Sequence, residues 1–463
     1  MQNTTSPRKA KHLPGLIQPV DYLETLWRHL TESLCQEVFE MTRDRERQRV
    51  WSLFTLVQFW IGLLHHPSMS QTRAIEESHK GSALFPEVAA TPESFFQRIQ
   101  SLRPAFFHNL FQRFVQALLP SSPGRFASHL SPALASFPEV LILDGSKLEK
   151  VARTLKVART TTAAILPGSL EAVYDLRRGL LRNLIFSPDG TQGEKHLLLE
   201  ALPSIPKGSL LVYDRYACYT TYWKEMQSRD LFLLTRAAST LTLTVKQEIL
   251  SLQRGRAVLK EALVEVGVGK DRPLLRLIHW KTPQGEWKLL TNVLELDRLP
   301  AHVAIELYGL RWSVERCFLS LKDTLNLNRL FNASPAAIAG QVYATALIYD
   351  ALRLAQEEIA RKVDVEPERL SPEKLFPRIL ENMVKLTWAE EGAEKYYWRV
   401  KAQNTDAPPP DLHLERLPAF KLSLQGITLE KRNGHRRKRR YCKGRRQFTS
   451  YSKIPGAKKY VRN

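Results

Sequence analysis

The stretch PEVLILDGS, residues 138–146, decides the fold that this sequence predicts. Residues 140–143 form a short apolar run typical of a buried strand, and Asp144 ends the run before two turn residues. A second stretch, GSLLVYDRY at 208–216, repeats this pattern and ends its apolar run at Asp214. Two buried strands that each deliver an aspartate at the carboxyl end are the usual way in which an open α/β sheet builds a site.

A third stretch, YGLRWSVERCFLSLK at 308–322, predicts a helix with a charged face. At about 100° per residue, Tyr308, Arg311, Glu315 and Lys322 fall within an arc of about 60°. One face would therefore carry a carboxylate beside two cations and a phenol, which suits a metal-binding acid next to a phosphate-binding surface. The alternative is an amphipathic helix whose charged face is simply solvated.

The three stretches together resemble the DDE transposases of bacterial insertion sequences that carry the YREK signature. The spacing of Tyr308, Arg311, Glu315 and Lys322 matches that signature at every offset, and the likeness covers about residues 140–350. The resemblance implies an α/β fold with an RNase H-like catalytic core. It further implies a cut-and-paste enzyme, with a DNA hairpin intermediate in some relatives.

The resemblance also implies a role for each residue. Asp144, Asp214 and Glu315 would be catalytic and would hold two Mg²⁺ ions, with Mn²⁺ as a substitute, because small hard cations prefer carboxylate oxygen. The DNA-binding residues of this site would be Tyr308, Arg311, Lys322 and Arg215. An arginine beside a metal-site aspartate is as often part of a structural ion pair, so both readings of Arg215 stay open.

The chain between Asp214 and Glu315 is far longer than one strand crossover needs, which predicts an inserted segment. Its alternating stretches predict a β-rich insertion at 239–300. In hairpin-forming relatives an aromatic of this insertion holds an extruded base, and Trp287 and Trp280 are the candidates here. The alternative is that both indoles pack the apolar face of a hairpin.

Two further carboxylates compete with the aspartates above. Asp189 lies in a Pro-Asp-Gly turn sequence, and Asp175 lacks the buried run that precedes Asp144. Neither is expected to be catalytic.

Charge points to a polyanionic partner. The chain has 68 Lys+Arg against 47 Asp+Glu, a formal net charge of +21. Residues 431–463 contain 14 Lys+Arg and no acid, which predicts either an arm that contacts DNA phosphates or a solubilising tail. The DNA-contacting residues of this arm would be Arg436, Arg437, Lys438, Arg439 and Arg440.

The whole sequence divides into six predicted segments. These are a lead-in (1–18), a helical N-terminal domain for DNA ends (19–137), the first part of the core (138–238), the insertion (239–300), the second part of the core with C-terminal helices (301–400), and a linker with the basic tail (401–463). A purely structural helical bundle is an equal alternative for 19–137. Four scattered cysteines favour a reducing compartment. No stretch is long enough to span a membrane, so we expect a prokaryotic protein of the cytoplasm, associated with the nucleoid.

The sequence therefore predicts an enzyme, a DNA transposase that cuts and joins strands at the inverted repeats of its own mobile element. Its partners would be the double-stranded DNA of the element ends and of the target, together with a second copy of the chain in a homodimer. Two alternatives remain open. One is an RNase H-like metal-dependent nuclease without joining activity, and the other is a non-catalytic DNA-binding protein derived from a transposase.

Overall fold

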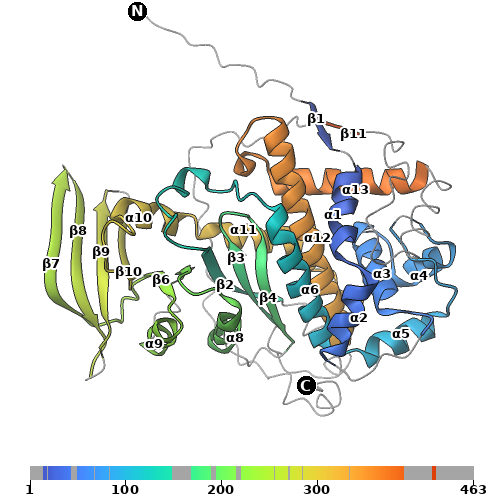
Figure 1. Cartoon of the computed structure of the whole chain (residues 1–463), viewed down its shortest axis with the longest axis horizontal. Coiled ribbons are helices and arrows are strands. Elements are labelled where there is room, and N and C mark those ends of the chain that lie inside the picture. The colour runs from blue at the N-terminus through green and yellow to red at the C-terminus, as the bar shows by residue number, and fades with distance from the viewer. Residues whose placement is uncertain are drawn as a thin grey trace, which may run out of the picture.

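The computed structural model describes residues 14–17, 19–42, 49–66, 68–82, 84–148, 168–188, 194–214, 220–254, 256–269, 272–283, 285–332, 334–389 and 420–423. A nine-stranded mixed sheet runs through the molecule, in the order β4-β3-β2-β5-β6-β10-β9-β8-β7 (Figure 1). The strands are β2 (Val140–Leu148), β3 (Gly168–Asp175), β4 (Leu181–Ser187), β5 (Leu210–Tyr213), β6 (Phe232–Arg236), β7 (Leu243–Arg254), β8 (Ala257–Val266), β9 (Leu274–Thr282) and β10 (Gly285–Thr291). The predicted α/β class is confirmed at this level.

The centre of the sheet is parallel. β5 pairs in parallel with β2 on one side and with β6 on the other, and the remaining neighbours are antiparallel. All four residues of β5 are buried. A strand with both faces covered reads as a continuous apolar run rather than an alternating one, which is why residues 140–143 and 210–213 carry such a clear sequence pattern.

Helices cover both faces of this central part. Alternate strand residues face either α8 (Glu194–Ala201) and α9 (Thr220–Ser228) or the larger core that contains α6 (Pro104–Leu118) and α12 (Pro335–Lys362). The second layer is the thicker one, as the helices to the right of β4 in Figure 1 show.

The N-terminal helices share their core with the C-terminal ones. α3 (Leu53–His65) is buried over nearly its whole length and packs, like α6, against α12. The remaining helices of this layer are α1 (Pro19–His29), α2 (Glu32–Glu40), α4 (Gln71–Lys80), α5 (Pro92–Ser101) and α13 (Pro372–Ala389). A separate pair of strands, β1 (Pro14–Ile17) and β11 (Phe420–Ser423), joins two distant parts of the chain.

Two helix starts follow directly from the sequence. Thr91 caps α5, where its hydroxyl accepts a hydrogen bond from the Ser94 N–H, and Pro92 occupies the first turn. Ser334 caps α12 in the same way before Pro335. No helix in the described ranges is long and apolar enough to cross a membrane.

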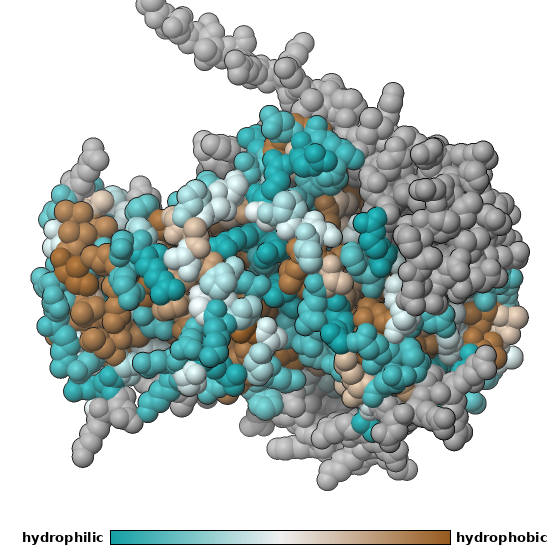
Figure 2. Space-filling view, in the orientation of Figure 1, coloured by the Kyte–Doolittle hydropathy of each residue, from teal (hydrophilic) through white to brown (hydrophobic). Residues whose placement is uncertain are grey.

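Strands β7–β10 extend the sheet away from the helices, at the left of Figure 1. Apolar side chains lie exposed at this end, with Val245 and Leu252 each 55% exposed, and Figure 2 shows a brown patch there. β7 is the outer strand, and its register against β8 shifts twice, between Val245 and Gln247 and between Glu248 and Leu250.

Residues 308–322 are not the single helix that the sequence predicts. α10 (Ala301–Gly309) ends before Arg311, α11 (Trp312–Leu319) follows, and η6 (Ser320–Thr324) is a π-helical turn. The Arg311 N–H bonds to the Tyr308 carbonyl and the Ser313 N–H to the Leu310 carbonyl, which is the tighter spacing of a 3₁₀ turn. The local pitch therefore changes twice along this stretch.

Candidate active site

Asp144 and Asp214 lie at corresponding positions of two neighbouring parallel strands. Ile142 of β2 is paired with Val212 of β5, and each aspartate follows two residues further along. Because side chains alternate along a strand, both carboxylates point to the face of the larger helical layer. Asp214 stands just beyond β5, where the Thr235 hydroxyl donates to its backbone carbonyl over 3.2 Å.

Arg311 connects two of the three predicted acids. Its Nη1 donates to Asp144 Oδ2 over 2.8 Å, and its Nη2 donates to Glu315 Oε1 over 3.2 Å. The Arg311 side chain is 7% exposed, against 21% for Asp144 and 31% for Glu315. One guanidinium therefore bridges a carboxylate on the sheet and a carboxylate on α11.

Asp214, the third acid, acts on Asp144 and Arg311 through its charge. Burial raises the pKa of the Asp144 carboxyl to about 6; the negative charges of Glu315 and Asp214 act in the same direction, and the Arg311 guanidinium opposes them. Burial works to lower the pKa of Arg311, but Asp144 and Asp214, followed by smaller contributions from Tyr308 and Glu315, raise it above its usual value. The three acids share one electrostatic environment.

Lys322 reaches the same end of β2 by another route. Its Nζ donates to the Ser146 hydroxyl over 2.6 Å and to the Lys147 carbonyl over 2.7 Å. Ser146 lies two residues beyond Asp144 on β2, so these two contacts hold the lysine beside the acids. A π turn adds a residue per turn, and this changes the direction in which Lys322 projects from the end of α11.

Tyr308 joins the site to the outer strands. Its ring lies 5.6 Å from that of Trp287, edge to face, and Trp287 in turn lies 5.8 Å from its cross-strand neighbour Trp280. Burial, followed by the negative charge of Asp214, raises the pKa of Tyr308 to about 12, so the phenol stays protonated at neutral pH. Trp287 thus lies beside the predicted catalytic residues, and its base-holding role stays a prediction.

The acids suit a small, hard cation by their chemistry, since all three offer carboxylate oxygen. Among the described residues, however, no group of three or more His, Cys, Asp and Glu side chains is close enough to hold a metal ion. The guanidinium of Arg311 lies between Asp144 and Glu315 instead. The residues fit Mg²⁺ in kind, with a protein cation standing between two of them.

Residues 136–350 match the family model described as "Transposase DDE domain". A curated relative, the putative transposase for insertion sequence element IS4SA from Synechocystis sp., is 31% identical over 93 residues. That alignment covers 19% of this chain and 28% of the relative, so the chain matches under a third of the relative's length. Together these findings support a DDE transposase of the insertion-sequence kind.

Two residues near the candidate site were missed from the sequence. Arg236 ends β6 and donates from Nη2 to the Glu286 carbonyl over 3.1 Å. Its positive charge opposes the rise in the pKa of Tyr308. Trp312 is 56% exposed and lies under Arg311, whose Cζ is 5.1 Å from the indole ring. Alternation along FLLTR (232–236) puts Arg236 on the same face as Leu234, and that pattern could have identified it.

Asp175 has a structural role. It is fully buried, pairs with Arg178 over 2.8 Å, and accepts hydrogen bonds from the backbone N–H groups of Arg177 and Arg178. Seven residues singled out from the sequence cannot be placed. Arg215, Asp189 and the basic run from Arg436 to Arg440 lie outside the described residues.

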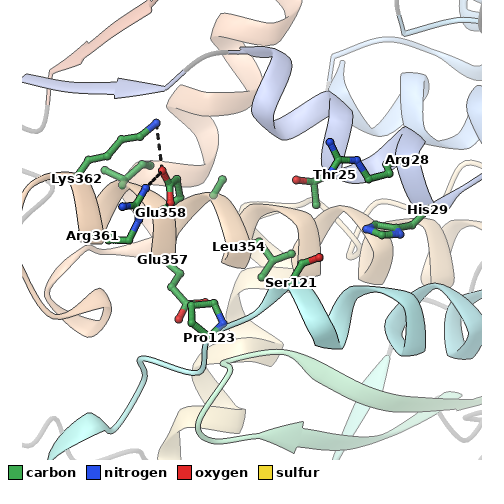
Figure 3. A pocket seen from close by; sticks show the side chains of 12 residues that line it. Thr25, Arg28, His29, Ser121, Pro123, Leu354, Glu357, Glu358, Arg361 and Lys362 are labelled. Atoms are coloured by element: carbon green, nitrogen blue, oxygen red, sulfur yellow. Dashed lines mark hydrogen bonds and ion pairs between the residues drawn. The ribbon is translucent and has the colours of Figure 1, made fainter. Parts of the chain in front are cut away.

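A cavity of about 500 Å³ lies away from the candidate site, between α1, η1 (Leu119–Ser121) and α12 (Figure 3). Its cations are partly neutralised, because Glu358 pairs with both Arg361 and Lys362. A second cavity of about 290 Å³ lies behind α11, where it is lined by Cys317 and Arg353. Asp144, Asp214 and Glu315 line neither one.

Proposed function

We propose that this protein is a DNA transposase that uses Asp144, Asp214 and Glu315, with Mg²⁺, to cut and join strands at the ends of its own element. One observation carries the proposal. Arg311 contacts both Asp144 and Glu315, and the charge of Asp214 acts on the same group. These contacts support one electrostatic site that combines two aspartates, just beyond the last parallel pair of β2 and β5, with a glutamate on α11.

The three carboxylates would hold the ions through their oxygens. When bound, two Mg²⁺ ions would activate the attacking oxygen and stabilise the leaving one in an in-line displacement at phosphorus. Arg311 would bind a backbone phosphate with its planar fork, and Lys322 would hold a second phosphate oxygen as a point charge. Tyr308, protonated at neutral pH, would donate a hydrogen bond to the same backbone.

In this proposal the centre of the sheet is an RNase H-like core, and β7–β10 are an insertion that leads to the helix of Glu315. The contact of Trp287 with Tyr308 supports an indole that faces the DNA end. A base freed from the duplex could stack on it, because stacking is available to every base.

The DNA partners are the element ends and the target duplex. Two ends must be handled together, so the proposed assembly is a homodimer on paired ends. The basic residues at 431–463 would add contacts to phosphate, on the ground of their composition alone.

The proposal is tested with the purified full-length chain and duplexes that contain the DNA flanking its gene. We expect Mg²⁺-dependent cleavage and the joining of a 3′-hydroxyl end to plasmid. Glu315→Gln should lower the cleavage rate by about 10³-fold or more, because a metal-binding carboxylate contributes several kcal/mol. Binding of the duplex should change by no more than about threefold, since the charge lost is one among many phosphate contacts.

Glu306→Gln is the matched control. Glu306 is exposed, lies on α10 and pairs with the exposed His129, so the same substitution there removes no acid of the site. Full cleavage by the Glu315 variant in Mg²⁺ would refute the assignment. Cleavage without any joining would favour a nuclease, and Mg²⁺-independent binding without cleavage would favour a DNA-binding protein.

A further inference from the structure

Arg311 uses the same carboxylate oxygens that an ion would need. Its two terminal nitrogens hold Asp144 Oδ2 and Glu315 Oε1, at 2.8 Å and 3.2 Å. Mg²⁺ binds carboxylate oxygen at about 2.0–2.1 Å and demands near-ideal geometry. An ion between these two acids therefore requires the guanidinium to move away.

The charge balance points the same way. Arg311 supplies one positive charge to a site that contains three acids, and its surroundings favour its charged form. Breaking its contacts without a replacement cation would leave Asp144 and Glu315 to repel each other in a partly buried site. The guanidinium and the divalent ions are thus competing partners for the same carboxylates.

Arg311 also has a second place to go. It lies at the junction of α10 and α11, beside the exposed face of Trp312, with its Cζ 5.1 Å from the indole ring. Arginine binds phosphate in a bidentate fork as readily as it binds carboxylate. A DNA phosphate that approaches over Trp312 would offer the guanidinium a replacement for both acids.

We propose that Arg311 is a reversible plug of the ion site: in the DNA-free protein it holds Asp144 and Glu315 together, and a phosphate of the element end draws it away so that the acids accept the ions. This inference rests on the proposed function. Its consequence is reciprocal coupling, because a group that must leave for both ligands makes each bind more tightly in the presence of the other. The ion site would then assemble mainly where an element end is bound.

The test is to titrate the full-length chain with Mn²⁺ and to measure the unbound ion by electron paramagnetic resonance. Without DNA, Arg311→Met should bind Mn²⁺ about 10-fold or more tightly than the wild type, within the usual range of coupling between sites. A duplex that contains the gene-flanking DNA should tighten Mn²⁺ binding by the wild type by a similar factor. It should not do so for Arg311→Met, whose plug is already absent.

The matched control is Arg316→Met on the same helix. Arg316 is exposed and donates to the Ser313 hydroxyl rather than to an acid, so its removal changes the net charge equally. Mn²⁺ affinity should then stay within about twofold, since an exposed charge is screened. The double variant Arg311→Met, Glu315→Gln should lose the gain, which would place the ion at these acids.

Unchanged or weaker Mn²⁺ binding by Arg311→Met, or an equal response to DNA in both proteins, would overturn the plug. If the thermal melt shows that Arg311→Met does not fold, Arg311→Lys replaces it. A single ammonium cannot bridge both acids as the guanidinium fork does. The Mn²⁺ affinity of Arg311→Lys should therefore be about threefold higher than that of the wild type, and no rise would count against the proposal. If the wild type cleaves DNA but the Arg311 variants bind Mn²⁺ no more tightly than the wild type, only the plug is refuted. If no variant cleaves DNA or binds Mn²⁺, the proposed function is refuted as well.

Discussion

Arg311 and Arg353 are equally buried, each 6% exposed, but they lie in regions with opposite kinds of partners. Arg353, on α12, donates to the Gly179 carbonyl, the Tyr174 hydroxyl and the Gln356 side-chain carbonyl, and its Cζ lies 4.0 Å from the Phe126 ring centroid. These acceptors are uncharged and are supplied by the protein itself.

Arg311 instead contacts two charged carboxylates that are 21% and 31% exposed. Burial alone therefore does not distinguish a structural arginine from a functional one. The chemistry of the acceptors does, because neutral acceptors in a closed core have no competitor, whereas acids at a partly exposed edge attract ions.

The sharpest way to break this contrast is to remove each guanidinium in turn. Arg353→Met should lower the free energy of unfolding by about 4 kcal/mol, because it leaves three buried acceptors without a donor. Arg311→Met should cost less, about 2 kcal/mol, because the two acids that it releases repel each other but are 21% and 31% exposed, so water can reach them. Urea unfolding of the two variants measures both, and equal losses would contradict the distinction.

A histidine of the N-terminal core is also buried among neutral partners, as Arg353 is. His65 Nδ1 donates to the Ile61 carbonyl over 2.7 Å, and its Nε2 lies 3.0 Å from the Tyr22 hydroxyl. Burial lowers the pKa of His65 from 6.5 to about 4. The unfolded chain thus binds a proton more readily than the folded one, and stability should be lost as the pH falls from 6.5 to 4.

The loss should amount to about 3 kcal/mol at most, at 1.36 kcal/mol per pKa unit. Comparing unfolding free energies of the wild type and His65→Gln across this pH range isolates the contribution of the histidine. Parallel curves for the two proteins would show that His65 does not stay neutral in the folded state.

A smaller effect should follow from crowding Arg353. Gly179 has a φ of +69°, and a Cβ there would collide with Arg353 Nη2 and come within 2.9 Å of the Phe126 ring. Gly179→Ala should therefore cost about 2 kcal/mol through backbone strain and displacement of the guanidinium. Gly285→Ala, where a Cβ meets nothing within 4 Å, is the control. A loss equal to that of the control would indicate that the core yields at no cost.

The central strands were predictable because both of their faces are covered. Residues 140–143 and 210–213 must be apolar throughout, and the second run ends where the chain leaves the sheet at Asp214. The predicted turn after Asp144 was wrong, because β2 continues to Leu148 and pairs with β3 beyond the aspartate. The helix starts at Pro92 and Pro335 were equally clear, since capping depends on one side chain and its near neighbours.

β7 was only partly predicted, at 239–245, although the strand runs from Leu243 to Arg254. Its two register shifts interrupt the alternation on which such predictions depend. The pitch changes around Arg311 and Lys322 were also missed, because helical spacing assumes a constant pitch. The ion pair from Arg311 to Asp144 joins residues far apart in the chain, and no local pattern encodes a contact of that range.

The outer edge of β7 affects how copies of the protein contact one another. A bare strand edge offers amide and carbonyl groups that can recruit another sheet. Here Lys246 and Glu248 sit on that edge beside the two register shifts, so an incoming strand would meet charged side chains and an uneven row of partners. Copies at high local concentration should then stay dispersed instead of pairing their sheets edge to edge.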